Sequence, residues 1–287
     1  MTKIDDLFGD ASPTISFEFF PPKDASSAKQ FAQALDDIAA IGPDFVSITY
    51  GAQGSDRQRT RDIVLATQAN FNFPAMAHLT CVGHTTAEID ALLDRYVAGG
   101  VQNILALGGD IPLSGVVPQG DFRHASDLVA HLRSRHDLSI GVAAHPEGHP
   151  RSTDLTADRK HLAAKLNEAD FAVTQFFFDV DHYRSLVDDL SRLGCDRPVI
   201  PGVIPITNAA QVKRFAAMSG ATIPAGLATR IDAAGDNPER VREVGVAAAA
   251  ALCHDLLEAG APGLHLYSLN RSEPALAVLN ELGLAKV

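Results

Sequence analysis

One glutamate in this sequence has the surroundings of a general acid. Glu18 lies in residues 14–20, a run in which Ile15, Phe17 and Phe19 are apolar and two prolines follow. A carboxyl group with aromatic neighbours and little water has its charged form disfavoured, so it can donate a proton near neutral pH. Period-2 alternation offers a second interpretation, in which Glu18 faces away from the phenylalanines and only forms a salt bridge. We favour catalysis, because a carboxylate in a buried strand has few structural roles.

Two further polar residues belong to apolar runs. Asp110 follows Gly108 and Gly109, which allow a flat ligand to approach the backbone closely. The Asp110 carboxylate either hydrogen-bonds a ring nitrogen of such a ligand or caps an ordinary loop. Gln175 carries both a donor and an acceptor, which suits the amide edge of a heterocycle. A hydrogen-bonded core amide is the alternative for Gln175.

The histidines do not indicate a metal site. His145 and His149 have the spacing of a helical metal pair, but Pro146 and Pro150 prevent a regular helix there. No HExxH, GxSxG or Walker A motif occurs. We therefore predict no metal and no serine nucleophile.

Eight short runs rich in β-forming residues must position these groups: residues 14–20, 44–50, 74–80, 103–109, 139–145, 171–177, 198–205 and 263–269. The first four begin about 30 residues apart, which is the length of one βα unit. Segments with helical spacing lie between the runs. Alternating strands and helices imply parallel pairing with right-handed crossovers. We therefore predict one α/β domain, residues 1–287, folded as a (β/α)8 TIM barrel.

The interval before the last run is longer than one helix requires. Segments near 223–234 and 239–258 both have helical patterns, so we expect an extra helix before the eighth strand. An open, doubly wound sheet is the alternative, disfavoured because no GxGxxG follows the first strand. In a (β/α)8 barrel the working residues lie at the C-terminal ends of the strands, where Glu18, Asp110 and Gln175 fall.

Composition excludes several classes of protein. The 287 residues include 35 acidic and 24 basic ones, a formal charge of −11. Nucleic-acid and anionic-membrane binders need a positive surface, so we expect neither partner. No signal-peptide pattern or membrane-length apolar run is present, and three scattered cysteines suit a reducing compartment. We expect a cytoplasmic globular protein.

The ends of the runs read, in order, SFEFFPPK, DFVSITYGA, AHLTCVG, ILALGGD, VAAHPEGHP, TQFFFDV, PGVIPITN and LYSLNRSEP. This order resembles the methylenetetrahydrofolate reductases of bacteria over about residues 13–284, and FEFFPP and TQFFFD are highly specific to that family. The resemblance implies a barrel that carries FAD and reduces 5,10-methylenetetrahydrofolate to 5-methyltetrahydrofolate with NADH or NADPH. The chain resembles the catalytic domain alone, without the regulatory domain of eukaryotic relatives.

The resemblance also implies roles for single residues. Glu18 matches the general acid that protonates N10 and opens the methylene bridge, and Asp110 matches an aspartate that contacts both pterin and flavin. The positions that hold the folate are matched by Gln175, Gln211, Phe215 and Arg271. The positions that line the flavin are matched by Thr49, Tyr50, Ala52, His78, Gly108, Gly109, Asp110, His124, Ala125, His145, His149, Asp158, His161 and Lys165.

Five positions around the flavin depart from the family's pattern. Gly108 and Ala164 replace the usual arginines, and His161 replaces a usual asparagine. His124 and His145 stand where tyrosines are usual. Each lost charge-assisted contact costs roughly 1.5–3 kcal/mol. We therefore expect FAD to bind loosely enough to be lost on purification.

Other functions stay open at this point. The altered flavin positions motivate a second hypothesis, a flavin-independent reductase in which NADH or NADPH passes hydride directly to the folate. The same enzyme working oxidatively on methyltetrahydrofolate is another alternative. A folate-binding protein without turnover is disfavoured, because Glu18, Asp110 and Gln175 are all present. No Rossmann fingerprint distinguishes NADH from NADPH, and analogy with relatives suggests a homo-oligomer, either a dimer or a tetramer.

Overall fold

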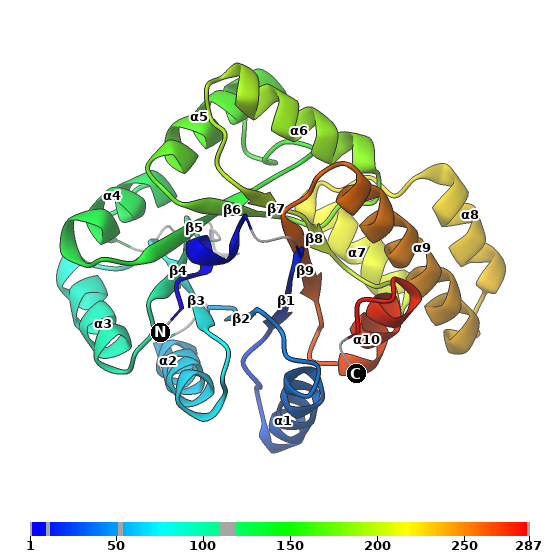
Figure 1. The fold of residues 1–287 in the computed structure, drawn as a ribbon, viewed down its shortest axis with the longest axis horizontal. Coiled ribbons are helices and arrows are strands. Elements are labelled where there is room, and N and C mark those ends of the chain that lie inside the picture. The colour runs from blue at the N-terminus through cyan, green and yellow to red at the C-terminus, as the bar shows by residue number, and fades with distance from the viewer. Residues whose placement is uncertain (1, 10–11, 51–53, 110–118, 286–287) are drawn as a thin grey trace.

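Nine parallel strands form one sheet that curves into a nearly closed barrel (Figure 1). The structure is a computed structural model that describes residues 2–9, 12–50, 54–109 and 119–285. Its strands are β1 (Thr14–Phe19), β2 (Phe45–Ile48), β3 (Ala75–Thr80), β4 (Asn103–Leu107), β5 (Ser139–Ala144), β6 (Phe171–Thr174), β7 (Val199–Ile200), β8 (Gly202–Val203) and β9 (Gly263–Tyr267). The sheet order is β7-β6-β5-β4-β3-β2-β1-β9-β8, so consecutive strands are neighbours as a barrel requires.

The two edges of the sheet come from a single predicted strand. Pro201 divides residues 198–205 into β7, which pairs with β6, and β8, which pairs with β9. A proline has no N–H to donate to a neighbouring strand, so regular pairing is interrupted there. The carbonyl of Pro201 still accepts a hydrogen bond from the N–H of His265 at 3.0 Å. The predicted (β/α)8 barrel is confirmed, with its seventh strand broken at this proline.

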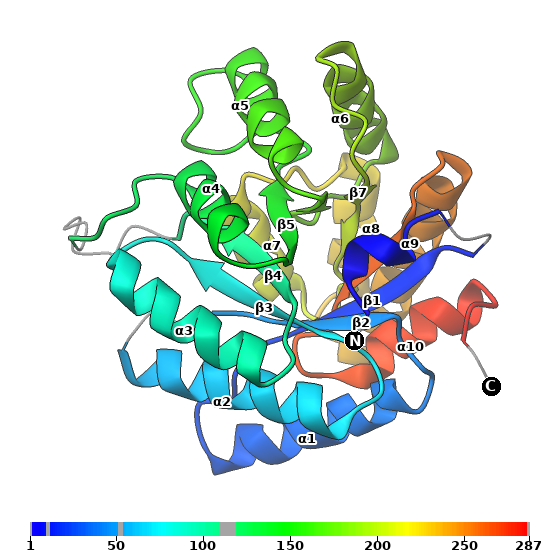
Figure 2. The same ribbon diagram turned by 60° about the vertical axis from the view of Figure 1, so that its left-hand side comes forward.

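Helices surround the barrel on its outside (Figure 2). They are α1 (Ala25–Ala39), α2 (Gly54–Asn70), α3 (Thr86–Ala98), α4 (Ala125–Arg135), α5 (Leu155–Asn167), α6 (Val180–Arg192), α7 (Ala209–Ser219), α8 (Ala225–Ala234), α9 (Pro238–Glu258) and α10 (Ser272–Glu281). The expected extra helix before the last strand is confirmed, since α8 and α9 both precede β9. Helix α7, which was not predicted, precedes them. None of the described helices is long and apolar enough to cross a membrane.

The interior of the barrel changes from apolar to polar along its axis. A short 3-10 helix, η1 (Ile4–Leu7), closes the N-terminal end, where the N–H of Ile4 donates to Asn103 Oδ1 at 2.8 Å. Ile4 packs there with Phe45 and Met76, which are also fully buried. Phe17 and Phe19 belong instead to the apolar layer between the strands and the helices. Because side chains alternate along a strand, Glu18 points into the barrel.

Candidate active site

The carboxyl group of Glu18 lies between two histidines inside the barrel. Its side chain is only 9% exposed, and Oε2 is 3.4 Å from His78 Nε2 on β3 and 3.7 Å from His265 Nε2 on β9. The phenylalanines beside Glu18 in the sequence pack on the other face of β1. The alternation expected for this strand is therefore present, and the side chains beside the Glu18 carboxyl group are histidines, which can exchange protons.

Burial keeps two side chains near Glu18, those of His78 and Tyr267, in their neutral forms. It lowers the pKa of His78 to about 4; the Glu18 carboxylate opposes this change and His265 adds to it. Burial also raises the pKa of Tyr267 well above its ordinary value, and Glu18 raises it further. The Tyr267 hydroxyl donates to the carbonyl of Thr174 at 2.7 Å. Both side chains are therefore neutral near pH 7.

His265 is a site residue that the sequence analysis did not identify. It lies in the run GLHLY, where no motif marks it. The available signal was the alternation of β9, because His265 and Tyr267 are two residues apart and so face the same side as Glu18. Only the pairing of β9 with β1 shows that this side is the barrel interior.

Residues at the end of β2 lie beside the mouth of the barrel. The N–H of Thr49 donates to the carbonyl of Phe19 at 2.9 Å, which continues the pairing of β1 and β2. The Tyr50 hydroxyl is 2.9 Å from His84 Nε2. Burial raises the pKa of Tyr50 to about 12, and the positive charge of Arg57 opposes this change.

Two predicted site residues, Ala52 and Asp110, lie outside the described residues.

The glycines after β4 differ in what surrounds them. Gly109 has φ +89°, and a Cβ there would stand 2.5 Å from the Val82 side chain, so this position requires glycine. At Gly108 a Cβ would meet nothing within 4 Å. Among the described residues, the space beside Gly108 is therefore open at the position where related chains are expected to carry an arginine.

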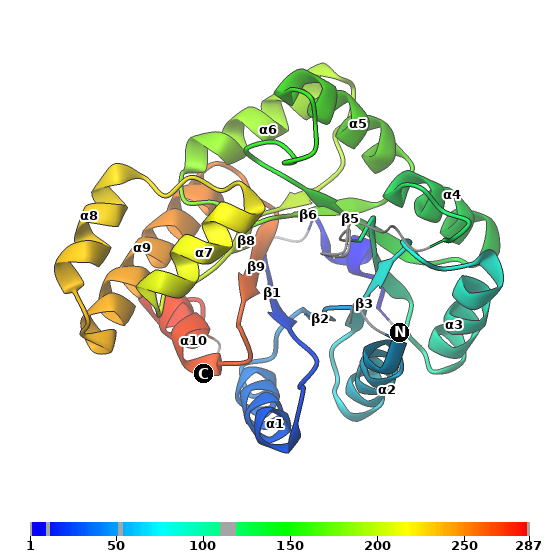
Figure 3. The same ribbon diagram turned by 180° about the vertical axis from the view of Figure 1, so that it is seen from behind.

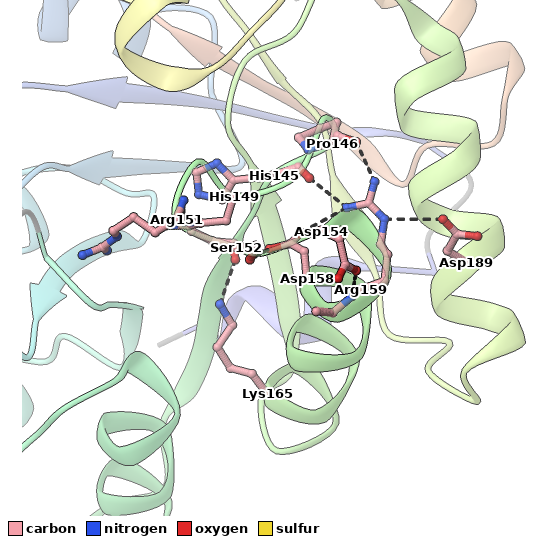
Figure 4. Close-up of polar contacts among 12 residues, drawn as sticks. His145, Pro146, His149, Arg151, Ser152, Asp154, Asp158, Arg159, Lys165 and Asp189 are labelled. Atoms are coloured by element: carbon pink, nitrogen blue, oxygen red, sulfur yellow. Dashed lines mark hydrogen bonds and ion pairs between the residues drawn. The ribbon is translucent and has the colours of Figure 1, made fainter.

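The loop between β5 and α5 brings two histidines together (Figure 4). The rings of His145 and His149 pack edge to face with centroids 4.5 Å apart. Burial lowers the pKa of His145 to about 4, and His149 contributes to the same change. In the described part of the chain, His145 Nδ1 is buried without a hydrogen-bond partner. No group of three or more potential metal ligands occurs among the described residues.

Helix α5 places a partly buried lysine beside the end of β5. Lys165 Nζ donates to the carbonyl of Ala143 at 3.0 Å (Figure 4). Burial lowers the pKa of Lys165 to about 8, and the Asp158 carboxylate opposes that change. Asp158 is buried and accepts a hydrogen bond from Ser152 Oγ at 3.0 Å. His161, on the same helix, is exposed.

Two other positions near the predicted flavin site are exposed. His124 is exposed and precedes Ala125, the first residue of α4. Ala164 is exposed on α5.

Arg159, which was not predicted as a site residue, is 3% exposed and supports the loop between β5 and α5. Its guanidinium donates to the carbonyls of His145 and Pro146 at 2.9 and 2.6 Å (Figure 4).

The four positions expected to hold the folate lie on three segments, which follow β6, β8 and β9. Gln175 follows β6, and its Oε1 accepts from the N–H of Phe176 at 3.0 Å. Gln211 and Phe215 are one turn apart on α7, the helix that follows β8 in the chain (Figure 3). Arg271 is exposed directly before α10. None of the hydrogen bonds or ion pairs of the described residues joins these four side chains to Glu18.

The chain was also compared with known proteins. A sequence model of the family described as "Methylenetetrahydrofolate reductase" matches residues 3–283. The chain is 37% identical over 270 residues to the 5,10-methylenetetrahydrofolate reductase of Escherichia coli strain K12, a match that covers 94% of this chain and 90% of that protein. It is 35% identical over 297 residues to the Arabidopsis thaliana protein named methylenetetrahydrofolate reductase (NADH) 1, and this match covers 98% of the chain but 50% of that protein.

A solved structure supports the fold independently. The dihydropteroate synthase of Xanthomonas albilineans, in complex with 7,8-dihydropteroate, is similar with a TM-score of 0.53 at 16% identity. The similarity covers 96% of this chain and 94% of that one. At this identity the likeness concerns the barrel alone.

Proposed function

The chain belongs to the methylenetetrahydrofolate reductase family, and from that premise we propose that it reduces 5,10-methylenetetrahydrofolate with hydride from NADH or NADPH, by way of bound FAD. Glu18 is the general acid in this proposal. We further propose that residues 1–287 form one catalytic domain of a cytoplasmic homo-oligomer.

The reaction requires one proton and one hydride. The bridge between N5 and N10 must open before its carbon can accept hydride, and protonation makes N10 a leaving group. A carboxyl group that is almost fully buried at the barrel mouth can deliver that proton without competition from water. The position of Glu18 between two buried histidines is the observation that carries the proposal. After proton transfer, the Glu18 carboxylate faces the cationic folate and stabilises it.

The described residues fit an anionic dinucleotide. Lys165 contributes an ammonium group beside β5, and His145 Nδ1, which has no hydrogen-bond partner among the described residues, is a second polar group there. At Gly108 a Cβ would meet no described atom within 4 Å, which leaves room there for a flat ring. FAD, when bound, accepts hydride from the nicotinamide and delivers it to the folate. Lys165, His145 and His149 would hold it.

An anaerobic assay of methyltetrahydrofolate formation, with and without added FAD and with each nicotinamide in turn, tests the proposal. We expect formation to depend on FAD, and protein as purified to contain little of it, because Gly108 and Ala164 lack the usual cations. A visible spectrum and an FAD titration measure the occupancy. Undiminished activity of stripped protein without FAD would instead establish direct hydride transfer. Folate binding without turnover would support the non-enzymatic alternative.

FAD affinity is expected to fall as the pH rises above about 8. The phosphates of the cofactor need the ammonium form of Lys165, whose pKa is about 8 in the unliganded protein. Above that pH, Lys165 must take up a proton when FAD binds, so the affinity for FAD falls by up to about tenfold per pH unit. Titration by flavin fluorescence between pH 7 and 9 measures the slope.

The variant Lys165→Arg is the control for this pH dependence. Arginine keeps its charge throughout the range, so the slope should flatten even if the affinity itself changes. Equal slopes for the wild type and Lys165→Arg would show that Lys165 does not hold the phosphates.

A further inference from the structure

The ring of His265 is fully buried and is hydrogen-bonded at its Nδ1 atom. Nδ1 is 2.8 Å from Ser16 Oγ, and that hydroxyl donates its own hydrogen to the carbonyl of Leu264 at 3.1 Å. While the Ser16 hydroxyl donates its one hydrogen to Leu264, it can only accept from His265, so this arrangement requires the tautomer with a proton on Nδ1.

The second nitrogen of the same ring faces the catalytic carboxyl group. His265 Nε2 is 3.2 Å from Ser47 Oγ and 3.7 Å from Glu18 Oε2. A doubly protonated ring would find an oxygen acceptor at each N–H, with a carboxylate beside it. Phe45 stacks against the ring with centroids 5.8 Å apart, an arrangement that also favours a cation. The surroundings of His265 thus accommodate an imidazolium.

The other groups that face this pair do not compete for the proton. His78 Nε2 has no hydrogen-bond partner in the part of the chain that the structure describes, although it faces the same carboxylate oxygen. Burial lowers its pKa to about 4. Tyr267, whose ring contacts that of His265, keeps its own proton on the bond to Thr174. His265 and Glu18 are therefore the two groups of this cluster between which a proton can be exchanged.

We infer that His265 stores, as an imidazolium, the proton that Glu18 delivers to the folate. This inference rests on the proposed function. The His265 Nε2–H bond breaks as a Glu18 O–H bond forms. That O–H bond in turn breaks as N10–H forms, and the electron pair of the bond between N10 and the bridging carbon moves to N10. The folate becomes an iminium cation, which hydride then reduces.

The overall charge balance supports this order of events. Before transfer, an imidazolium is paired with a carboxylate; afterwards, the carboxylate faces a cationic folate and the imidazole is neutral. The buried negative charge is therefore compensated in both states, which lowers the cost of keeping it away from water. Water restores the proton to His265 after the product leaves. His265 is a positioning and proton-storing residue, because it acts through Glu18.

The variant His265→Asn tests the inference through kcat and its pH profile. Asparagine retains a donor for Ser16 but cannot store a proton. We expect kcat for methylenetetrahydrofolate reduction to fall about 100-fold, and its pH profile to shift to lower pH, because Glu18 must then hold the proton alone. KM for the folate should stay within about threefold, since His265 acts through Glu18. His131→Asn, which removes a histidine bonded to Asp90 outside the barrel, should change neither.

Two results would overturn the inference. The first is a His265→Asn enzyme with the wild-type kcat and pH profile, while Glu18→Gln is inactive. The second comes from NMR of protein labelled with ¹⁵N-histidine, which needs no catalysis and no His265 variant. We expect an imidazolium at His265 near pH 7 in the wild type and a neutral ring in Glu18→Gln; a neutral ring in both contradicts the inference. A wild type that fails to reduce the folate but shows this NMR pattern would refute the proposed function alone.

Discussion

Replacing Glu18 with glutamine is expected to lower kcat for methylenetetrahydrofolate reduction by roughly 10²–10⁴-fold, the usual contribution of a general acid. Glutamine preserves the size of the side chain and can still contact His78 and His265. It has no acidic proton to deliver to N10, so the methylene bridge stays closed and hydride has no acceptor. The loss should therefore appear in kcat and not as a failure to fold.

A second reaction of the same enzyme separates this loss from general damage. Oxidation of NADH by an artificial acceptor needs no proton at N10, so FAD-loaded Glu18→Gln should carry it out at nearly the wild-type rate. Glu168→Gln, an exposed substitution at the end of α5, is the matched control and should retain both reactions. Normal folate turnover by Glu18→Gln would assign the acid to another residue.

Much of the architecture was predictable because local patterns determine it. The strand runs and helical segments recur at the length of a βα unit, and this repetition limits the topology to few choices. Alternation in β1 also shows that Glu18 and the neighbouring phenylalanines occupy opposite faces. The sequence alone did not show which residues stand opposite Glu18, so the phenylalanines were wrongly taken as its environment.

The partners of Glu18 depend on contacts between distant parts of the chain. His265 is 249 residues from Ser16, and only the register of β1 and β9 places the two side by side. The periodicities of helices and strands relate only residues that are close in sequence, so they do not predict this contact. The break at Pro201 was also not predicted, because a proline in an apolar run does not show which neighbouring strand each half pairs with.

The burial of Arg159 was not predicted, for a different reason. The buried face of α5 carries Asp158 and Arg159, whereas hydrophobic periodicity identifies buried positions only when they are apolar. An arginine followed by a lysine near the start of a helix is usually a solvated pair. Here the guanidinium is enclosed by the β5–α5 loop on one side and α6 on the other.

Replacing Arg159 with methionine is expected to lower the free energy of unfolding by about 3 kcal/mol, because removal of one partner of a buried ion pair leaves the other uncompensated. The Arg159 guanidinium lies 3.3 Å from Asp158 Oδ2 and 3.5 Å from Asp189 Oδ2. It also supplies the hydrogen bonds to the carbonyls of His145 and Pro146. Methionine fills a similar volume, so the loss reflects charge and hydrogen bonding rather than a cavity.

Urea unfolding monitored by circular dichroism measures this loss, and Lys160→Met, at the exposed neighbouring position, should change stability by less than about 0.5 kcal/mol. If the uncompensated Asp158 carboxylate is the main cause, the double variant Asp158→Asn/Arg159→Met should be more stable than Arg159→Met alone. A cost below about 1 kcal/mol, close to that of a surface ion pair, would show that Arg159 does not hold the loop. Because that loop carries His145 and His149, a real loss should also weaken FAD binding, which links the stability of α5 to the cofactor site.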